Sequence, residues 1–405
     1  QRREQTLAVN QGLTSKGLRV HDVAYRDMPG ATRLDFTNER EYTFIGLISM
    51  IDPPRPEAIQ AVADAKRGGI RTVMITGDHR VTASAIARQI GILQDGELAL
   101  SGHELDEMDD GALDQKLEQV SVYARVSPEH KIRIVEAWKR RGKIVAMTGD
   151  GVNDAPALKS ADIGVAMGVT GTEVSKDAAA MILADDNFAT IVKAVVNGRG
   201  VYTNIKNAIT FLLSGNMAGI LSVLVTSILG LPNPFLPVHL LFINLLTDSL
   251  PAIAIGVEPS SGDMLSQKPR DPSEPILNWS LLGRIGIYGL LIAAATMAAY
   301  FLGLNSGGAP LAMTLAFATL TLARLFHGFN CRGRQSLFAL GLLSNKASLA
   351  AFAAGVVFLA AVLFVPFLEG LFQVAPFTLE QIGLCAILAL LPTVIIQIGK
   401  CAGLR

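Results

Sequence analysis

The second half of the chain contains six apolar stretches, each long enough to cross the hydrocarbon core of a bilayer, which is about 30 Å thick. These stretches cover residues 208–230, 236–257, 281–304, 309–329, 347–368 and 379–399. Of 35 Lys and Arg plus 35 Asp and Glu, 54 lie in residues 1–207 and 16 in residues 208–405. The chain is therefore predicted to form a soluble domain followed by a bundle of six transmembrane helices.

The composition excludes two other classes of chain. A net charge of zero and a hydrophobic content of 50% do not fit a disordered chain, nor one that binds nucleic acid through a basic surface. We therefore expect the lipid bilayer, and no nucleic acid, among the partners of this chain.

Basic residues follow the second, fourth and sixth apolar stretches, whereas the other loops between the stretches contain no Lys or Arg. The basic residues are Lys268, Arg270, Arg332, Arg334, Lys346, Lys400 and Arg405. Because cytoplasmic loops carry the excess of Lys and Arg, the soluble domain and both termini are predicted to be cytoplasmic. We expect a multi-pass integral protein of the plasma membrane.

Between Ile45 and Asp185 short apolar runs alternate with amphipathic stretches, a pattern typical of βαβ units. The expected strands are Thr72–Ile75, Val120–Ala124, Lys143–Met147, Ile163–Ala166 and Ala180–Leu183. The pattern predicts a Rossmann-like α/β domain with one parallel, doubly wound sheet, whose ligands bind at the carboxyl ends of the strands. The expected domains are residues 1–44 (the tail of another domain), 45–190 (the α/β domain) and 191–405 (the membrane domain).

Two of these strand ends have residues that can handle phosphate, and each also fits ordinary structure. At Thr76, Gly77 and Asp78 a hydroxyl and an open backbone can hold phosphate oxygens, or the three residues form a simple turn. Lys131 lies in the first turn of a predicted helix after another strand, where it can face a phosphate or solvent.

A third strand end gives the strongest signal. Asp150 and Asp154 are four residues apart, with glycines on either side of Asp150 and Pro156 closing the turn. Such an acidic pocket suits a hard ion with oxygen ligands, such as Mg²⁺. Asn153, between the two carboxylates, can donate to a phosphoryl oxygen.

Four segments, in this order, resemble the phosphorylation domain of P-type cation-transporting ATPases, which belongs to the haloacid dehalogenase superfamily. They are residues 52–55 (DPPR), residues 74–78 (MITGD), the Lys131 segment and residues 148–159 (TGDGVNDAPALK). The resemblance extends from about Gly17 to the C-terminus. It implies a haloacid-dehalogenase-like domain in which ATP phosphorylates an aspartate that is then hydrolysed.

The resemblance assigns a role to each matching residue. Asp150 would ligate Mg²⁺, and Asp154 would support that site. Thr76 and Asn153 would hold the phosphoryl group, while Lys131 would neutralise its developing charge. The nucleotide side and the hinge would be formed by Arg19, Asp52, Arg55, Gly77 and Asp78. Residues 1–44 would be the remnant of the nucleotide-binding domain.

The family's nucleophile lies in an Asp-Lys-Thr-Gly-Thr segment, which does not occur in these 405 residues. The resemblance therefore implies the C-terminal portion of a pump, up to membrane helices five to ten, that needs an N-terminal part of the same polypeptide as partner. The phosphorylation domain would be incomplete, without the central strand of its sheet, and this chain alone is expected to be inactive. If the chain is the whole gene product, a non-catalytic membrane module is the alternative.

Asp248 is the clearest charged residue at membrane depth, where charges are costly and mark functional sites. Asn244 precedes it by four residues and is expected on the same helix face, and Pro251 frees backbone groups nearby. Such oxygen ligands suit a hard cation. A structural hydrogen-bond network between helices is the alternative.

Residues 244–251 resemble the sixth helix of the calcium-pump branch. The resemblance implies that Asn244 and Asp248 belong to the calcium site common to that branch. It also implies that Asn216 and Thr247 match ligands of the other site in two-site pumps. Gly219 stands where that other site would have a Glu.

Arg324 stands where the same site would have a second Glu. Because a guanidinium stays protonated, Arg324 can take the place of the second cation and pair with Asp248; the alternative is that it snorkels to the interface. We predict a pump that uses ATP and Mg²⁺ to export one Ca²⁺ per cycle, with Arg324 as a built-in counter-charge. A pump for Na⁺/K⁺ or Mn²⁺ is the alternative.

Overall fold

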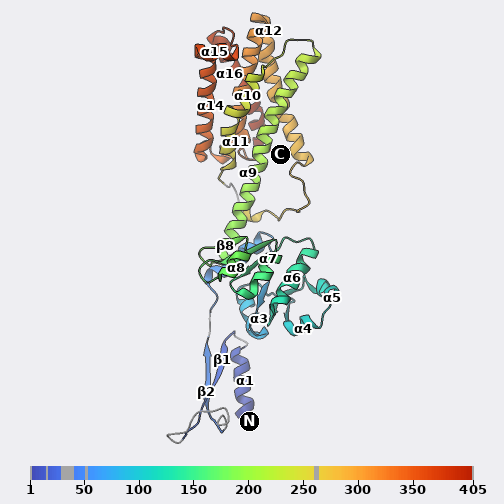
Figure 1. Ribbon diagram of the computed structural model, residues 1–405, viewed down its shortest axis with the longest axis vertical. Coiled ribbons are helices and arrows are strands. Elements are labelled where there is room, and N and C mark those ends of the chain that lie inside the picture. The colour runs from blue at the N-terminus through green and yellow to red at the C-terminus, as the bar shows by residue number, and fades with distance from the viewer. Residues whose placement is uncertain (1, 15–16, 29–40, 51–52, 260–263, 404–405) are drawn as a thin grey trace. The chain divides into compact units, whose positions relative to one another are not determined.

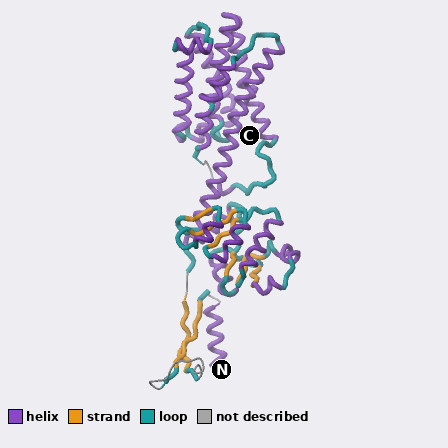
Figure 2. Tube along the Cα trace, viewed as in Figure 1, coloured by secondary structure: helices purple, strands orange, loops and turns teal. Residues whose placement is uncertain are grey.

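The computed structural model describes residues 2–14, 17–28, 41–50, 53–259 and 264–403 (Figure 1). The chain divides into two compact units. Unit 1 comprises Gln1–Val195 with Leu265–Pro272, and unit 2 comprises Val196–Met264 with Ser273–Arg405. The described strands all belong to unit 1, whereas unit 2 consists of helices and loops (Figure 2).

Unit 1 begins with helix α1 (Arg2–Thr14) and the antiparallel strands β1 (Arg19–Tyr25) and β2 (Thr43–Met50). Arg19 pairs with Met50 and Tyr25 with Thr43, with a bulge between Val23 and Ala24. Most side chains of β2 are exposed, so this hairpin has little core of its own.

The remainder of unit 1 contains two three-stranded parallel sheets. Their strand orders are β3 (Met74–Thr76), β5 (Val120–Ala124), β4 (Leu98–Ser101) and β6 (Ala146–Gly149), β7 (Ile163–Met167), β8 (Met181–Leu183). The predicted parallel arrangement is confirmed. The strands form two sheets instead of one, with a gap between β3 and β6 where the resemblance implies a missing central strand, and strand β4 was not expected. Two sheets form because, among the described residues, no strand pairs with both β3 and β6.

β3 and β6 are therefore outer strands that remain partly uncovered. β5 is buried along its whole length, as a central parallel strand should be, whereas the three residues of β3 are half-buried. Ile144, just before β6, is 61% exposed. Ile75 of β3 packs on the cluster that contains Met147 of β6, so the two sheets meet through side chains.

Short helices cover these sheets. They are α2 (Pro56–Arg67), α3 (Arg80–Gln89), α4 (Gly102–Asp106), α5 (Asp110–Lys116), α6 (Pro128–Arg140), the 3₁₀ turn η2 (Val152–Asp154), α7 (Ala155–Ser160) and α8 (Glu173–Ala178). Side-chain caps start five of them, α3, α4, α5, α6 and α8. Ser127 accepts from His130 N at 3.4 Å, and Pro128 takes the first helical position. This cap places Lys131 in the first turn of α6.

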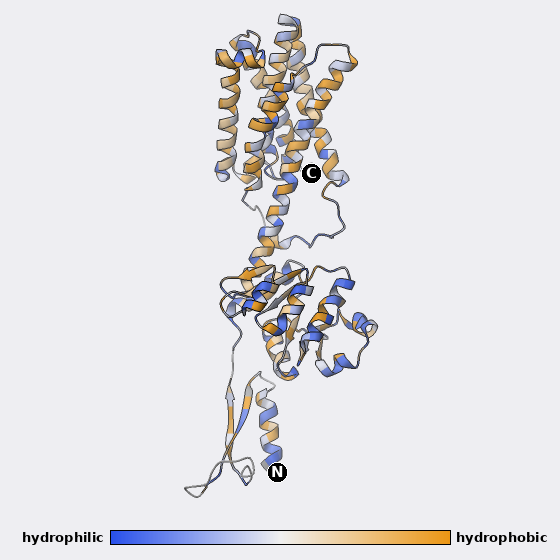
Figure 3. Cartoon of the chain, viewed as in Figure 1, coloured by the Kyte–Doolittle hydropathy of each residue, from blue (hydrophilic) through white to orange (hydrophobic). Residues whose placement is uncertain are grey.

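Unit 2 is a bundle of mostly apolar helices (Figure 3). They are α9 (Phe188–Ile228), whose first residues belong to unit 1, α10 (Pro237–Phe242), the π-helical turn η3 (Ile243–Thr247), α11 (Ser249–Gly256), α12 (Trp279–Asn330), α13 (Leu337–Leu340), α14 (Lys346–Phe364), α15 (Pro366–Phe372) and α16 (Leu379–Cys401). The 3₁₀ turns η4 (Met264–Ser266) and η5 (Leu342–Ser344) lie in the connections. Aromatic rings of Phe242, Phe317 and Phe372 meet in its core.

Five helices of the described chain are long and apolar enough to cross a membrane, where six were expected. The difference arises in α12, whose 52 residues contain both the third and the fourth expected stretches. Gly307 and Gly308 break the helix inside α12, with non-helical backbone angles, and Gly308 has a φ of 75°. Glycine tolerates that conformation without strain. Six crossing segments remain a prediction.

A buried ion pair ties the ends of several unit 2 helices together. Arg332 donates to both carboxylate oxygens of Glu258, at 2.9 and 2.8 Å, and its side chain is 0% exposed. Asn345, the N-cap of α14, donates to Glu258 Oε2 at 2.5 Å and to Ala254 O at 2.9 Å. Asn204 of α9 donates to Glu258 O at 2.8 Å. A two-pronged, fully bonded pair of this kind offsets the cost of burying both charges.

Removing one charge of this pair is expected to destabilise unit 2 more than removing both. Arg332→Met leaves the Glu258 carboxylate buried without its partner, at a cost of about 3–5 kcal/mol. The double variant Arg332→Met/Glu258→Gln leaves no buried charge and should unfold closer to the parent. Thermal unfolding of the full-length protein in detergent measures the stability of both variants. An equal loss of stability in the two variants would contradict the role assigned to the ion pair.

Candidate functional site

The strand ends of unit 1 meet at one edge. After β3, Asp78 O accepts from Arg125 N at 3.0 Å and Thr76 O accepts from Val126 N at 3.4 Å. Arg125, which follows β5, has a φ of 50°, an uncommon conformation for a residue other than glycine. The β3 turn is thereby joined to the segment that leads into α6 and Lys131.

Thr76 and Asp78 close the β3 turn on each other. Thr76 Oγ1 accepts from Asp78 N at 3.1 Å and donates to Asp78 Oδ2 at 3.1 Å. Gly77 between them is exposed and has open space where a side chain would begin. The hydroxyl of Thr76 is thus held at the carboxyl end of a parallel strand, where such folds bind ligands.

Lys131 and Asp154 connect the β5 and β6 ends through an ion pair. The second carboxylate oxygen of Asp154, Oδ2, accepts from the backbone N–H groups of Asp150 and Gly151, both at 3.2 Å. Asp154 is 7% exposed. The Asp154 carboxylate thereby fixes the loop that carries Asp150.

Gly149 is required by this arrangement. A Cβ built on Gly149 would lie 2.7 Å from Cγ of Asp154, closer than real side chains approach. The glycine before Asp150 therefore lets the Asp154 carboxylate reach under the loop.

Asp150 and Asn153 are left available for a ligand. Both are exposed, and neither side chain has a hydrogen bond recorded within the described residues. Mg²⁺ is commonly held by one or two carboxylates together with waters and phosphate oxygens, so the free carboxylate of Asp150 fits this ion. The described residues contain no group of three His, Cys, Asp or Glu side chains that could hold a metal by themselves.

Of the three other predicted nucleotide-side residues, Arg55 alone has a side chain that the structure describes. Arg55 donates to Asp186 O at 3.0 Å. Arg19 lies in β1, and only its backbone is described; Asp52 lies outside the described residues.

Sequence reasoning missed Asp186, which organises the neighbouring loop. Its carboxylate accepts from Val169 N at 2.9 Å and Thr170 N at 2.8 Å. These backbone donors lower the pKa of Asp186 to about 2. The adjacent loop residues Thr172 and Ser175 donate to Asp150 O at 2.9 and 3.1 Å, so this loop supports the candidate Mg²⁺ ligand. The run Asp185-Asp186-Asn187 after an expected strand was the available signal.

In unit 2, Asp248 and Arg324 form an ion pair in the middle of the bundle. The two residues are 1% and 2% exposed. Arg324 Nη2 also donates to Asn216 Oδ1 at 3.1 Å. The guanidinium therefore points into the bundle.

The pair is joined through one oxygen only. Nη2 of Arg324 bonds Oδ2 of Asp248, while Oδ1 of Asp248 and Nε of Arg324 have no hydrogen-bond partner within the described chain. A Cβ built on Gly215 would lie 2.7 Å from Cζ of Arg324, so the guanidinium rests directly on this glycine. One carboxylate oxygen is consequently free for another positive partner.

The other predicted ion-site residues differ in their placement. Thr247 is buried, and its hydroxyl donates to Ile243 O at 3.0 Å. Asn244 is exposed and does not share the face of Asp248. The expectation from a spacing of four does not hold because this turn is π-helical, with Asp248 N bonded to Ile243 O, five residues back. At Gly219 a Cβ would meet nothing within 4 Å.

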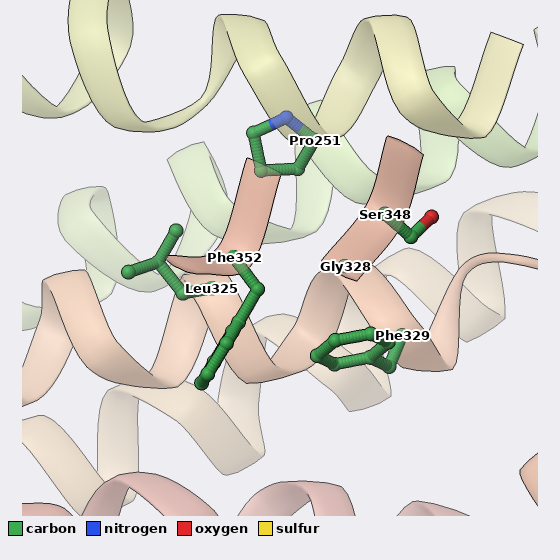
Figure 4. A pocket seen from close by; sticks show the side chains of 6 residues that line it. All are labelled: Pro251, Leu325, Gly328, Phe329, Ser348 and Phe352. Atoms are coloured by element: carbon green, nitrogen blue, oxygen red, sulfur yellow. The ribbon is translucent and has the colours of Figure 1, made fainter. Parts of the chain in front are cut away.

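A small cavity lies beside Pro251 (Figure 4). Its volume of about 10 Å³ is enough for about one water molecule. The lining residues come from α11, α12 and α14 and are Pro251, Leu325, Gly328, Phe329, Ser348 and Phe352. The Ser348 hydroxyl has no partner among the described residues. The cavity is too small for a hydrated cation. The candidate cation site of unit 2 is the Asp248 carboxylate, whose Oδ1 has no partner within the described residues.

The Lys131–Asp154 contact can be tested directly. Asp154→Asn removes the charge that holds the amine, and we expect acylation of Lys131 by an amine-reactive reagent to become several-fold faster. Mass spectrometry of the labelled full-length protein measures the rate. Lys116, exposed on α5, should react equally in both proteins, and an unchanged Lys131 rate would contradict the ion pair.

Comparison with known proteins assigns two parts of the chain to protein families. A family model for the cation transporting ATPase C-terminus matches residues 232–402, and one for haloacid dehalogenase-like hydrolases matches residues 15–162.

Curated relatives extend this similarity to almost the whole chain. A calcium-transporting ATPase of Listeria monocytogenes is 46% identical over 96% of this chain and 44% of its own length. Calcium-transporting ATPase 1 of Bacillus cereus is 41% identical over 99% of this chain and 47% of its own length. A type 2C calcium-transporting ATPase of Mus musculus is 40% identical over 82% of this chain and 35% of its own length. The chain thus spans less than half the length of these relatives. It belongs to the P-type cation-transporting ATPases, in their calcium-pump branch.

Proposed function

We propose that the chain is part of an ATP-driven pump that exports Ca²⁺ through an aspartyl-phosphate intermediate and carries one ion per cycle. The observation that carries this proposal is the half-engaged carboxylate of Asp248, with one oxygen bound to Arg324 and the other free. The calcium-transporting relatives support the choice of ion.

The phosphate chemistry is assigned to the edge of unit 1. The γ-phosphoryl group of ATP would pass to a carboxylate oxygen of an Asp in the full-length polypeptide, outside these 405 residues, and ADP would leave; water would later release phosphate from that Asp. Lys131 would offset the charge of the phosphoryl oxygens, and Thr76 and Asn153 would bind them. Asp150 would hold Mg²⁺, which supplies electrostatic stabilisation of the transferring group.

Asp154 and the nucleotide-side residues have supporting roles in this proposal. Asp154 orients Lys131 and the Asp150 loop through its ion pair and its two backbone hydrogen bonds. Arg19, Asp52, Arg55, Gly77 and Asp78 are proposed to shape the nucleotide side and the hinge.

The cation would bind at the free oxygen of Asp248. Backbone counting supports additional oxygen ligands here. The N–H of Asp248 donates to the carbonyl of Ile243, and the N–H of Ala252 donates to the carbonyl of Asp248. The four carbonyls of residues 244–247 lie between these two acceptors in the sequence. Of the three residues between Asp248 and Ala252, Ser249 and Leu250 each have a backbone N–H that can donate to these carbonyls, whereas Pro251 has none. Two carbonyls therefore lack a helical N–H. The Ser249 hydroxyl donates to Leu245 O at 2.9 Å and to Asn244 O at 3.4 Å, so the carbonyls of residues 246 and 247 are the ones proposed as ligands, and carbonyl oxygens are ligands that Ca²⁺ accepts.

Arg324 supports a single site. Its guanidinium stays charged and lies on Gly215, bonded to Asn216, the residue that would otherwise serve a second cation. A second Ca²⁺ next to this charge, in an apolar bundle, would meet strong repulsion. Asn244 and Thr247 remain proposed ligands, reached through a rearrangement of the π-helical turn η3.

The membrane arrangement is proposed on the same basis. Helices long and apolar enough to span the bilayer support an integral membrane protein. The break at Gly307 and Gly308 would let α12 cross twice and make six crossings, with the soluble domain and both termini cytoplasmic at the plasma membrane. The proposed domains are residues 1–44 of the nucleotide-binding domain, residues 45–190 of the phosphorylation domain and residues 191–405 in the membrane.

The full-length protein, reconstituted in vesicles, is expected to transport one Ca²⁺ per ATP hydrolysed. Simultaneous measurement of Ca²⁺ uptake and phosphate release gives the ratio, and Asp248→Asn should abolish uptake because the ligand loses its charge. A ratio of two would contradict the single site. Uptake of Mn²⁺ or Na⁺ in preference to Ca²⁺ would instead reassign the ion.

Asp150 is expected to be essential for phosphorylation. Asp150→Asn removes the charge for Mg²⁺ and should lower phosphoenzyme formation from ATP by about 100-fold or more. Asp95→Asn, at an exposed position before β4, is the matched control and should leave the phosphoenzyme unchanged. Normal phosphorylation in Asp150→Asn would remove Asp150 from the site.

A further inference from the structure

Four buried side chains of unit 2 form an unbroken hydrogen-bond chain between two backbone groups. The links are Leu337 N to Gln397 Oε1 (2.8 Å), Gln397 Nε2 to Asn330 Oδ1 (2.8 Å), Asn330 Nδ2 to His327 Nδ1 (3.3 Å), His327 Nε2 to Ser214 Oγ (2.8 Å) and Ser214 Oγ to Thr210 O (2.6 Å). This chain, the α16–α12–α9 chain, connects three helices, and none of its side chains is more than 8% exposed.

The chain has one direction because its first member can only donate. Leu337 N–H must donate, so the Gln397 atom that it meets is the carbonyl oxygen. Gln397 then donates its amide N–H to the oxygen of Asn330. Asn330 is left with its N–H₂ group, which donates to Nδ1 of His327 and to Thr393 Oγ1, the latter at 3.0 Å.

The direction of donation along this chain determines which ring nitrogen of His327 carries the proton. Since Nδ1 accepts a hydrogen bond, it carries no proton, and the proton of the neutral ring lies on Nε2. Nε2–H donates to Ser214 at 2.8 Å and also lies 3.2 Å from Cys331 Sγ, the weaker acceptor. The Ser214 hydroxyl donates to Thr210 O. The rings of Phe211, stacked at 6.2 Å, and Tyr288, edge-on at 5.2 Å, hold the imidazole from two sides.

Ser214 directly precedes Gly215, on which the guanidinium of Arg324 rests. An arginine normally meets a carboxylate through two parallel hydrogen bonds. Here the second bond is missing, although Nε of Arg324 and Oδ1 of Asp248 are both buried and both lack a partner in the described chain. Nε is the guanidinium atom nearest to Gly215, where a built Cβ would lie 2.4 Å from it.

We infer that His327 is a positioning residue for Arg324. Its Nε2–H holds Ser214, and hence Gly215, against α12, so that the guanidinium bonds only one oxygen of Asp248. Without this bond α9 can move, Arg324 can turn to engage both oxygens, and the oxygen assigned to the cation becomes blocked. The inference rests on the proposed single cation site.

Variants at His327 test the roles of the two ring nitrogens separately. His327→Asn keeps an acceptor near the position of Nδ1 but loses the donor to Ser214. We expect the Ca²⁺ concentration for half-maximal phosphorylation of the full-length protein to rise about ten-fold, which is the size of effect expected for the loss of one buried hydrogen bond. His327→Gln places an amide N–H near the position of Nε2 and should restore most of the affinity. Ser214→Ala should match His327→Asn.

Two controls distinguish positioning from general damage. Ser222→Ala removes a hydroxyl from the same helix, 0% exposed like Ser214 but bonded, among the described residues, only to Ala218 O of its own helix. It should change the affinity less than about two-fold. In an Arg324→Lys background the charge remains but the two-pronged contact is impossible, so His327→Asn should have little further effect. If His327 acts through Arg324, the effects of His327→Asn and Arg324→Lys on the affinity are therefore not additive.

Two results would overturn the inference. One is an equal effect of His327→Asn in the Arg324→Lys background and in the parent protein; the other is a failure of His327→Gln to restore affinity while Ser222→Ala is normal. The ratio of Ca²⁺ to ATP in the unaltered protein tests the single site separately. A ratio of two sinks the proposed function, whereas a ratio of one with wild-type affinity in His327→Asn sinks only the positioning role.

Discussion

A pair of opposite charges buried among apolar helices is the constraint on which unit 2 depends. Removing an ion from water costs several kcal/mol even after the protein relaxes, so Asp248 and Arg324 can exist at 1% and 2% exposure only as partners. The surrounding chain is adapted to this pair. Gly215 provides space for the guanidinium, and the π-helical turn before Asp248 turns its carboxylate inward. The pair is incompletely bonded, which leaves it able to respond to a cation.

In unit 1 a second carboxylate has the corresponding role. Asp154 binds Lys131 with one oxygen and the loop N–H groups of Asp150 and Gly151 with the other. Because that single group joins α6 to the β6 loop, Asp150 and Asn153 can remain exposed without the loop losing its shape. The buried Asp154 thus holds the loop in shape, and the exposed Asp150 is left to bind a ligand.

Much of this could be read from the sequence, because hydropathy and strand-end motifs are local signals. The expected stretch 347–368 became α14, which ends at Phe364 because Val365 precedes Pro366 and cannot continue the helix. The π-helical turn was not predictable, since no residue type specifies five-residue hydrogen bonds, and the face assigned to Asn244 was therefore wrong. The bond between Ser214 and His327 joins residues 113 positions apart, and a single sequence contains no signal for such a contact. The separation of the two sheets lies between β3 and β6, where the resemblance implies a missing central strand.

The polarity of the α16–α12–α9 chain has one more consequence. A conduit for protons must be able to reverse every donor and acceptor along it after each passage. Here a backbone N–H stands at one end and a backbone carbonyl at the other, and neither can exchange its role; the two amide side chains between them also do not pass protons on. Although it contains a histidine beside the ion pair, the chain therefore behaves as a mechanical tie and not as a proton wire.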